Sequence, residues 1–389
     1  MIGFSWLACL LLLPSVGAAA HAIPDGAALD GEVAHAMAAT HARGMAMAII
    51  DEGKVVKVRA YGERNASGDP LQIDTIMYGA SLTKAAFAYM VMQLVDAGRL
   101  HLDTPIGEYL DKPLPAYPDE DRYAPWSGLA DDPRWRLITP RILLTHSAGF
   151  ANFAFLEPDG RLRIHTTPGK HYAYSGEGMI LLQFVLERGV GLDVGTEMQH
   201  RVFDRFGMTH TSMMWRPDFA SNLADGWEAD GKAVPHDERS RPRAAGSMDT
   251  TIADFARFAA GYIRGDGLSS ESRAELVKAQ LAIHTASQFP SLQPDAPRGK
   301  QHPSLAAGLG VVVFEGPQGK GFMKGGHNES TGNMWVCVER HRRCAVILAN
   351  DVRAEPAFPH LVAFAIGETG APWRWEYGAM PLWSGNPPK

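Results

Sequence analysis

Cysteine is scarce in this sequence, with only Cys9, Cys337 and Cys344 among 389 residues. There is no C-x-x-C pair, no Cys/His set with the spacing of a zinc site and no H-E-x-x-H pattern. We therefore predict no catalytic metal and no cofactor. The sequence also lacks a long basic run, and its formal net charge is −6. Because a phosphate-binding face needs clustered Lys and Arg, nucleic acid is not an expected partner.

Internal repeats and low-complexity tracts are absent as well, and 46% of the residues are apolar. This composition excludes a disordered or fibrous chain. It is sufficient to bury a large core, either in one big domain or in two closely packed lobes.

The first 22 residues contain no Lys, Arg, Asp or Glu. They include an apolar run at 10–13 and end in a stretch of mostly small residues at 16–22, which is typical of a signal peptide. The lack of Lys and Arg before the run departs from that pattern, and an uncleaved hydrophobic anchor is the alternative. Because the run is shorter than the ~20 apolar residues that a span needs, we expect residues 1–22 to be a signal peptide. We then expect no stable membrane span in the mature chain and an exported protein, periplasmic or secreted.

Residues that favour β-strands gather near both ends of the mature chain. Runs at 45–50 and 55–61 are separated by Asp-Glu-Gly, which predicts an antiparallel hairpin. Strand character returns between 308 and 350, and a final helix is expected near 361–366. Between these regions, 81–280 shows helical patterns with recognisable starts and stops. Both ends of the chain are thus expected to contribute to one sheet.

The order of these elements predicts an α/β fold of the α+β type. We expect an antiparallel sheet, flanked by helices and formed by both chain ends, with an inserted all-helical lobe. The α/β half is assigned to 23–80 plus 304–389 and the helical half to 81–303, within one domain. Loops rich in proline or acidic residues, at 112–134 and 289–303, are expected to edge a cleft between the halves.

Cys337 and Cys344 lie on either side of a turn-like stretch at 339–342. A symmetric hairpin would place them opposite one another, and an oxidising compartment would permit a cross-strand disulfide. Two unpaired thiols on adjacent strands are an equally good interpretation of the sequence.

Ser81 and Lys84 open a predicted amphipathic helix. Their i, i+3 spacing puts the hydroxyl and the amine side by side on one helical face. A serine hydroxyl is a poor nucleophile until a neighbour takes its proton, and lysine can do so only when burial or nearby cations lower its pKa. Alone, however, an S-x-x-K motif is weak evidence, and a solvated helix start is the better explanation of it.

Two further segments strengthen the interpretation. Tyr174 precedes an apolar helix at 179–186, where a phenol can reach a cleft. Lys324 ends a predicted strand and is followed by Gly325 and Gly326, which let a substrate approach the backbone closely.

Together these motifs resemble those of the β-lactamase-related serine hydrolases, which include class C β-lactamases, D-alanyl-D-alanine carboxypeptidases and several esterases. The resemblance covers nearly all of the mature chain and implies the β-lactamase/transpeptidase-like fold. The matching stretches are A-S-L-T-K at 80–84, D-T-P-I-G-E-Y-L at 103–110, I-T-P-R-I-L-L-T-H-S-A-G-F at 138–150, P-G-K-H-Y-A-Y-S-G-E-G-M-I-L-L at 168–182, F-G-M-T-H-T-S-M at 206–213 and K-G-G at 324–326.

This resemblance implies a role for each matching residue. Ser81 would be the acylated nucleophile and Lys84 its partner. Tyr174, which matches the tyrosine of the family's Y-x-N element, would pass a proton to the leaving group. Lys324 would steady the Tyr174 phenolate and the acidic end of the substrate.

The resemblance also implies an oxyanion hole made by the backbone N–H groups of Ser81 and His327. Loss of one such donor typically costs ~10² to 10³ in rate. Gly325 and Gly326 would line the path of the substrate.

One position departs from the family pattern. Where the family has Asn two residues after the tyrosine, this sequence has Gly176. The amide that would bind Lys84 and the substrate's own amide is missing, which counts against efficient β-lactam hydrolysis. One interpretation of Glu177 is that it replaces part of that contact. The better explanation is that its carboxylate satisfies backbone donors at the start of a helix.

The expected function is hydrolysis of a small-molecule ester, peptide or β-lactam through an acyl-enzyme on Ser81. Gly176 favours an esterase or a D-amino-acid peptidase over a β-lactamase. The alternative is a penicillin-binding or sensor module of the same fold that does not turn over. His146 and Ser147 resemble part of a G-x-S-x-G elbow, but the first glycine is absent, so we interpret them as a structural helix end.

Overall fold

The computed structural model describes residues 21–385. Apart from His21 and Ala22, the predicted signal segment 1–22 lies outside the described residues. Within residues 21–385, no helix combines the length and the apolar character that crossing a membrane requires.

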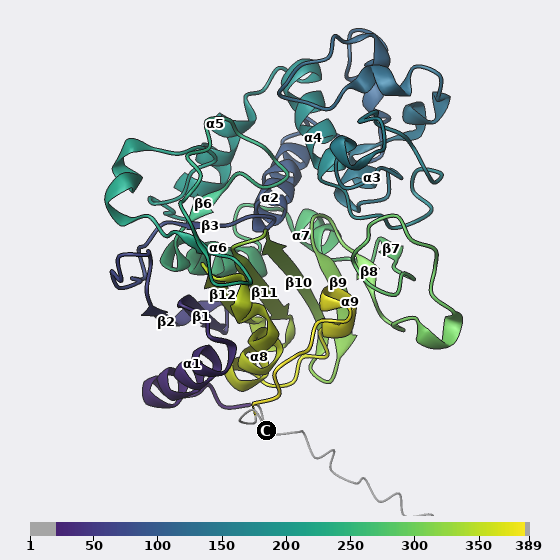
Figure 1. The fold of residues 1–389 in the computed structure, drawn as a ribbon. Helices are drawn as coiled ribbons and strands as arrows, with labels where there is room; N and C mark the ends of the chain where they lie inside the picture. Colours follow the sequence, from purple (N-terminus) through teal and green to yellow (C-terminus); the bar gives the residue numbers. More distant parts are fainter. Residues whose placement is uncertain (1–20, 386–389) are drawn as a thin grey trace, which may run out of the picture.

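An eight-stranded antiparallel sheet forms the centre of the molecule (Figure 1), which confirms the predicted fold class. Strands from both ends of the chain meet side by side in it, because β1 pairs with β12. The strand order is β2-β1-β12-β11-β10-β9-β8-β7. The bounds are β1 Gly44–Asp51, β2 Lys54–Gly62, β7 Leu281–Ala282, β8 Ala306–Ala307, β9 Val312–Gly316, β10 Gly319–His327, β11 Gly332–Val338 and β12 Arg343–Ala349.

Helices cover both faces of the sheet, because successive side chains of a strand point to opposite faces. In β1, Met47 packs into one apolar cluster and Ala48 into the other. Helices α1 (Gly26–Thr40) and α8 (Phe358–Ile366) cover the first face, while α6 (Ile252–Arg264) and α2 (Leu82–Asp96) share the second cluster. Helix α6 thus flanks the sheet although it belongs to the segment 81–303.

The predicted helical half contains strands as well as helices. Its helices are α2, α3 (Pro140–Leu144), α4 (Gly176–Phe184), α5 (Val194–Met198), α6 and α7 (Ser270–Leu276), and the chain ends with α9 (Trp373–Tyr377). It also contributes β4 (Gly226–Trp227), β5 (Ala233–Val234), β6 (Asp249–Thr250) and β7, with β3 (Met77–Tyr78) just before it. The prediction of an all-helical lobe therefore left out four short strands. Each of them has only two residues, which is too short to show an alternating pattern in the sequence.

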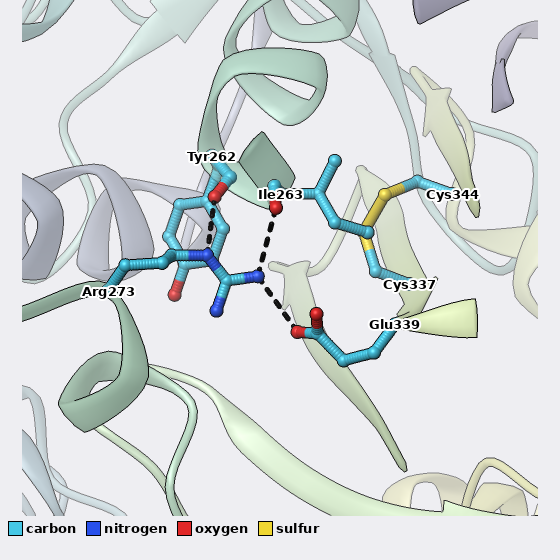
Figure 2. The surroundings of a disulfide bond; sticks show 6 residues. All are labelled: Tyr262, Ile263, Arg273, Cys337, Glu339 and Cys344. Carbon is cyan, nitrogen blue, oxygen red and sulfur yellow. Dashed lines mark hydrogen bonds and ion pairs between the residues drawn. A yellow bond between two sulfur atoms is a disulfide. The ribbon is translucent and has the colours of Figure 1, made fainter. Parts of the chain in front are cut away.

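A disulfide joins Cys337 of β11 to Cys344 of β12. The two residues are register partners in the hairpin, and both are fully buried. Figure 2 shows the bond beside the end of α6, where the Arg273 guanidinium donates to Tyr262 O and Ile263 O and pairs with Glu339 at 2.8 Å. Of the two states that the sequence left open, the structure has the disulfide.

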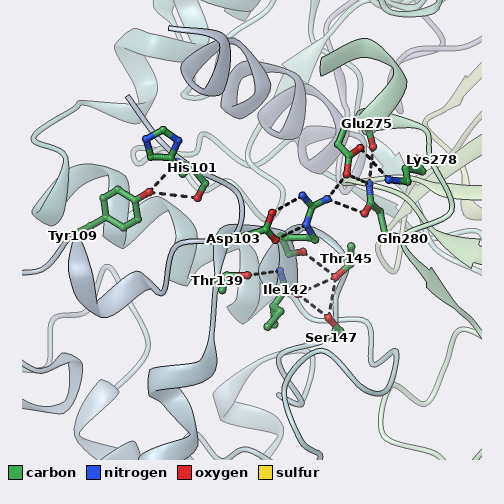
Figure 3. Close-up of polar contacts among 11 residues, drawn as sticks. His101, Asp103, Tyr109, Thr139, Ile142, Thr145, Ser147, Glu275, Lys278 and Gln280 are labelled. Carbon is green, nitrogen blue, oxygen red and sulfur yellow. Dashed lines mark hydrogen bonds and ion pairs between the residues drawn. The ribbon is translucent and has the colours of Figure 1, made fainter. Parts of the chain in front are cut away.

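Arg141 of α3 links segments that are far apart in the chain. Its guanidinium binds both carboxylate oxygens of Asp103, at 2.6 and 2.7 Å, and contacts Glu275 of α7 and Gln280 next to β7. Figure 3 shows the side chains of Asp103, Glu275 and Gln280 gathered around the same guanidinium group. The link holds the segment around α3 against the edge of the sheet.

Candidate active site

Ser81 lies at the start of α2, after a tight turn that leaves β3. The preceding residue, Ala80, has a φ of 46°, a left-handed conformation that costs energy in a residue with a side chain. Thr83 stabilises the turn, since its hydroxyl donates to Ala80 O at 2.6 Å and accepts from Met248 N at 3.1 Å. The turn aims the Ser81 side chain into a cleft.

Lys84 lies one helical turn further and is only 1% exposed. Its Nζ is 2.9 Å from Ser81 Oγ and also contacts the carbonyl oxygen of Ala245. Burial, together with the charge of Lys324, holds the pKa of the Lys84 amine well below its usual range. The neutral form, which can accept a proton, is therefore favoured.

Tyr174 lies between the two lysines, with Lys84 Nζ 5.1 Å and Lys324 Nζ 5.0 Å from the centroid of its ring. Lys324 Nζ donates to Tyr174 OH at 3.4 Å and to Gly325 O at 2.7 Å. Burial raises the pKa of the Tyr174 phenol, an effect that a hydrogen bond with Ser81 partly offsets. Burial lowers the pKa of Lys324 to about 8, while Glu376 acts in the opposite direction. At neutral pH the phenol is thus protonated and Lys324 carries a charge.

These side chains line a cleft of about 380 Å³. All the residues that the sequence assigned to the site border it: Ser81, Lys84, Tyr174, Lys324, Gly325, Gly326 and His327. The cleft is also bordered by Phe289, from the loop 289–303 that was expected to edge it, and by residues that sequence reasoning missed, among them Asn152, Phe153, Arg243, Gln288 and Glu376. Among the described residues, no group of three or more His, Cys, Asp or Glu side chains is arranged to hold a metal ion.

Gly326 lets β10 pass very close to the start of α2. A Cβ at this position would lie 2.9 Å from Leu82 N, 3.0 Å from Ser81 N and 3.0 Å from Gly79 O. Only a residue without a side chain fits this approach. Strand β10 therefore brings His327 close to the helix end that carries Ser81.

At Gly176, where the family has an asparagine, the structure shows what fills the space of the missing side chain. A Cβ here would overlap the ring of Phe153, which occupies the space beside the backbone. Glu177 accepts a hydrogen bond from Ala154 N at 3.0 Å. Its carboxylate thus satisfies a backbone donor, the explanation that the sequence favoured.

Glu376 of α9 is buried and comes from the far end of the chain. Its Oε2 accepts from Gln288 Nε2 at 2.9 Å, and a Cβ at Gly325 would overlap its Oε1. Burial raises the pKa of this carboxyl, and the charge of Lys324 opposes the rise. No sequence motif marks Glu376, because packing alone brings α9 to the cleft.

His146 and Ser147 do not form a nucleophile elbow. The Ser147 hydroxyl is buried, donates to Ile142 O at 3.2 Å and lies 2.8 Å from Thr145 Oγ1 (Figure 3). The His146 ring packs against Tyr174 with a centroid separation of 4.5 Å, and its Nδ1 lies 3.2 Å from Ser175 N. Both residues support the segment that carries Tyr174.

The chain is 26% identical over 339 residues to the D-alanyl-D-alanine-carboxypeptidase/endopeptidase AmpH of Escherichia coli, covering 82% of each chain. It is 30% identical over 206 residues to the lovastatin esterase of Penicillium rubens, covering 45% of this chain and 50% of the esterase.

Solved structures share the fold. The D-alanine carboxypeptidase AmpC of Burkholderia cenocepacia aligns with a TM-score of 0.69 at 20% identity, covering 88% of this chain and 99% of that one. The octameric penicillin-binding protein homologue from Pyrococcus abyssi aligns with a TM-score of 0.66 at 20% identity, covering 85% and 74%. The family model described as Beta-lactamase matches residues 29–365. Because this match spans most of the chain, the protein belongs to the β-lactamase family.

Proposed function

We propose that the protein is a serine hydrolase that cleaves ester or amide bonds through an acyl-enzyme on Ser81. One observation carries this proposal: the Ser81 hydroxyl lies 2.9 Å from the buried amine of Lys84, whose pKa is held well below its usual range. A hydroxyl beside a neutral amine can lose its proton as it attacks a carbonyl carbon. The family's carboxypeptidases and esterases are consistent with this chemistry.

In the acylation step, Ser81 Oγ bonds to the carbonyl carbon and its proton passes to Lys84 Nζ. The protonated Tyr174 gives its proton to the leaving oxygen or nitrogen as the bond to the acyl carbon breaks. Lys84 then returns a proton to the Tyr174 oxygen, and the charged Lys324, 3.4 Å from this oxygen, stabilises its transient negative charge. In the second step, water attacks the acyl carbon, which releases the acid and restores the Ser81 hydroxyl.

The negative oxygen of each tetrahedral intermediate needs donors. We assign this role to the backbone N–H groups of Ser81 and His327, which the close approach at Gly326 supports. Gly325 and Gly326 then border the bound substrate.

The disulfide bears on the cellular compartment of the protein. The disulfide Cys337–Cys344 favours an oxidising environment, which supports export to the periplasm or the exterior. The partner is a small-molecule ester, peptide or β-lactam.

A fluorophosphonate probe tests the nucleophile. We expect the protein to gain the mass of one probe at Ser81, and we expect Ser81→Ala to abolish labelling. Ser127→Ala, at an exposed serine, is the matched control and should label like the parent. Labelling of Ser81→Ala at the parental rate would show that the nucleophile lies elsewhere.

Turnover separates the enzyme from a binding or sensor module. A panel of p-nitrophenyl esters, D-alanyl peptides and nitrocefin should reveal many product molecules per protein for esters or peptides. Labelling at Ser81 without release of product under excess substrate would instead favour the module that does not turn over.

A further inference from the structure

Glu376 is a buried acidic side chain on the wall of the cleft, and no step of the acylation proposed above needs it. Only 6% of the residue is exposed, and it borders the cleft together with Gln288 and Phe289. It belongs to α9, near the end of the chain. Because the burial of a charged group is costly, a carboxylate in this place needs partners.

Three hydrogen bonds join α9 to the segment that contains Gln288. Gln288 N donates to Trp375 O at 2.9 Å, and Gln288 Nε2 donates to Glu376 Oε2 at 2.9 Å. Trp375 Nε1 donates to Thr285 Oγ1 at 3.0 Å. These bonds hold the Glu376 carboxylate in one place, so the position of its second oxygen is fixed as well.

This second oxygen, Oε1, lies against β10 one residue after Lys324. A Cβ at Gly325 would overlap it, so the missing side chain of Gly325 makes room for the carboxylate. The carbonyl oxygen of Gly325 accepts from Lys324 Nζ at 2.7 Å. Among residues 21–385, no donor is bonded to Glu376 Oε1, whereas Oε2 has Gln288. Glu376 Oε1 is therefore an acceptor that a ligand in the cleft can use.

Glu376 lies on the side of the cleft to which the leaving group departs. In the proposed acylation Tyr174 gives its proton to the leaving group, and Lys324 Nζ is 3.4 Å from Tyr174 OH. The negative charge of Glu376 acts on both groups, because it raises the pKa of the Lys324 amine and the pKa of the Tyr174 phenol. A leaving group protonated by Tyr174 therefore lies within reach of this charge.

An anionic leaving group is disfavoured by this arrangement. The charge of Lys324 is already balanced by Glu376, so a second carboxylate would compete for Lys324 and would be repelled. The charge of Arg243, which also borders the cleft, acts on Glu177 at the start of α4. A hydroxyl or amide N–H on the leaving group, in contrast, can donate to Glu376 Oε1. The acidic substrate end that the sequence resemblance assigned to Lys324 therefore does not suit this cleft.

We propose that Glu376 determines specificity for the leaving group: it accepts a hydrogen bond from a neutral donor there and disfavours a leaving group that carries a carboxylate. This inference rests on the proposed acyl-enzyme mechanism and narrows its substrate class. The preferred substrates are esters or amides whose alcohol or amine part carries a hydroxyl or an amide. A free C-terminal amino acid, which carries a carboxylate, is a poor leaving group for this cleft.

Two acetyl esters of nearly the same shape test this preference. The leaving group of meta-acetoxybenzamide is neutral and has amide N–H donors, whereas that of meta-acetoxybenzoate carries a carboxylate. With each kcat/KM near neutral pH divided by the rate of spontaneous hydrolysis, we expect the parent to prefer the benzamide by roughly tenfold. Glu376→Gln keeps an oxygen that can accept from Gln288 Nε2 and removes the charge, so the preference should fall to one or below.

Glu376→Ala removes the charge together with the acceptor and should lose the preference as well. Glu368→Gln is the matched control, because Glu368 lies on the same C-terminal segment and accepts from Gly370 N at 2.9 Å, but is exposed and does not border the cleft. This variant should keep the parental preference. Fluorophosphonate labelling at Ser81 and the thermal midpoint establish that each variant is folded and reactive.

Two results would overturn this inference and leave the proposed function intact. One is a parent that labels at Ser81 and hydrolyses both esters equally well. The other is a Glu376→Gln variant that labels at Ser81 and keeps the parental preference. Failure of the parent to label at Ser81 would instead overturn the proposed function.

Discussion

Two lysines share the cleft, and their environments lower the pKa values of their amines to different extents. Lys84 is penalised by burial and by the charge of Lys324, so its pKa falls well below the usual range. Lys324 is equally enclosed, but the carboxyl of Glu376 offsets part of the penalty, and its pKa is lowered only to about 8. The neutral form is thus favoured more strongly at Lys84 than at Lys324, which is largely protonated at neutral pH, and this difference suits proton transfer between the two sides of the site.

The pH dependence of ester hydrolysis follows from this difference. Below pH 8 Lys324 is protonated and above it the charge is lost, so kcat/KM for a neutral ester should fall above about pH 8. In Lys324→Arg the guanidinium stays protonated, and the alkaline fall should move up by more than about one pH unit. Lys320→Arg, at an exposed position of the same strand, should keep the parental profile. An unchanged alkaline limb in Lys324→Arg would assign that limb to another group.

At the scale of elements, the site depends on how closely β10 approaches the start of α2. The positive φ of Ala80 turns the chain into the helix, and Gly326 admits the strand beside Ser81 N. Neither element alone forms the site, since one carries the nucleophile and the other carries Lys324 and His327.

Gly326→Ala tests this approach. The added methyl group would lie about 3 Å from the Ser81 and Leu82 amides, so strand and helix must separate. Because a displacement of about 1 Å can cost roughly 10²-fold in rate, we expect a loss of that order in the rate of fluorophosphonate labelling. Gly299→Ala, where a Cβ meets nothing within 4 Å, should label normally. Normal labelling of Gly326→Ala would mean that the approach is not needed for acylation.

At the scale of the whole molecule, polar links between distant segments hold the cleft walls in place. Arg141 connects Asp103 with Glu275 and Gln280 and is about three-quarters shielded from solvent. A guanidinium that is partly buried and makes several hydrogen bonds contributes more to the free energy of unfolding than an exposed ion pair does.

Urea unfolding measures this contribution. Arg141→Ala should lower the free energy of unfolding by about 1–2 kcal/mol with an unchanged m-value, because Asp103 loses its ion-pair partner and Glu275 loses one of its partners. Arg163→Ala breaks a solvent-exposed ion pair with Asp159 and should lower the free energy of unfolding clearly less than Arg141→Ala does. An equal decrease in the free energy of unfolding in both variants would show that Arg141 stabilises the protein no more than an exposed ion pair does.

Features that depend on residues close together in the chain could be predicted from the sequence. The i, i+3 spacing of Ser81 and Lys84 fixes their proximity as soon as the helix forms, and the hairpin pattern placed Cys337 opposite Cys344. Helix α1 had a readable signal that we did not use: Asp25 caps its start, and Leu29, Val33 and Ala36 recur at helical spacing on its buried face.

The sequence by itself thus indicated the family, the antiparallel sheet formed by both chain ends and those cleft residues that belong to the recognised motifs, such as Ser81, Lys84 and Lys324. The tertiary structure alone decided which of the two cysteine states holds, which side chains fill the space at Gly176 and Gly325, and that Asn152 and Glu376 border the cleft. The physical reason is the distance along the chain. The periodicity of a helix or strand can be recognised within a few residues, whereas the contacts at Gly176 and Gly325 join α4 and β10 to segments that only tertiary packing brings near. The lowered pKa of Lys84 belongs to the same class, because burial is a property of the folded surroundings.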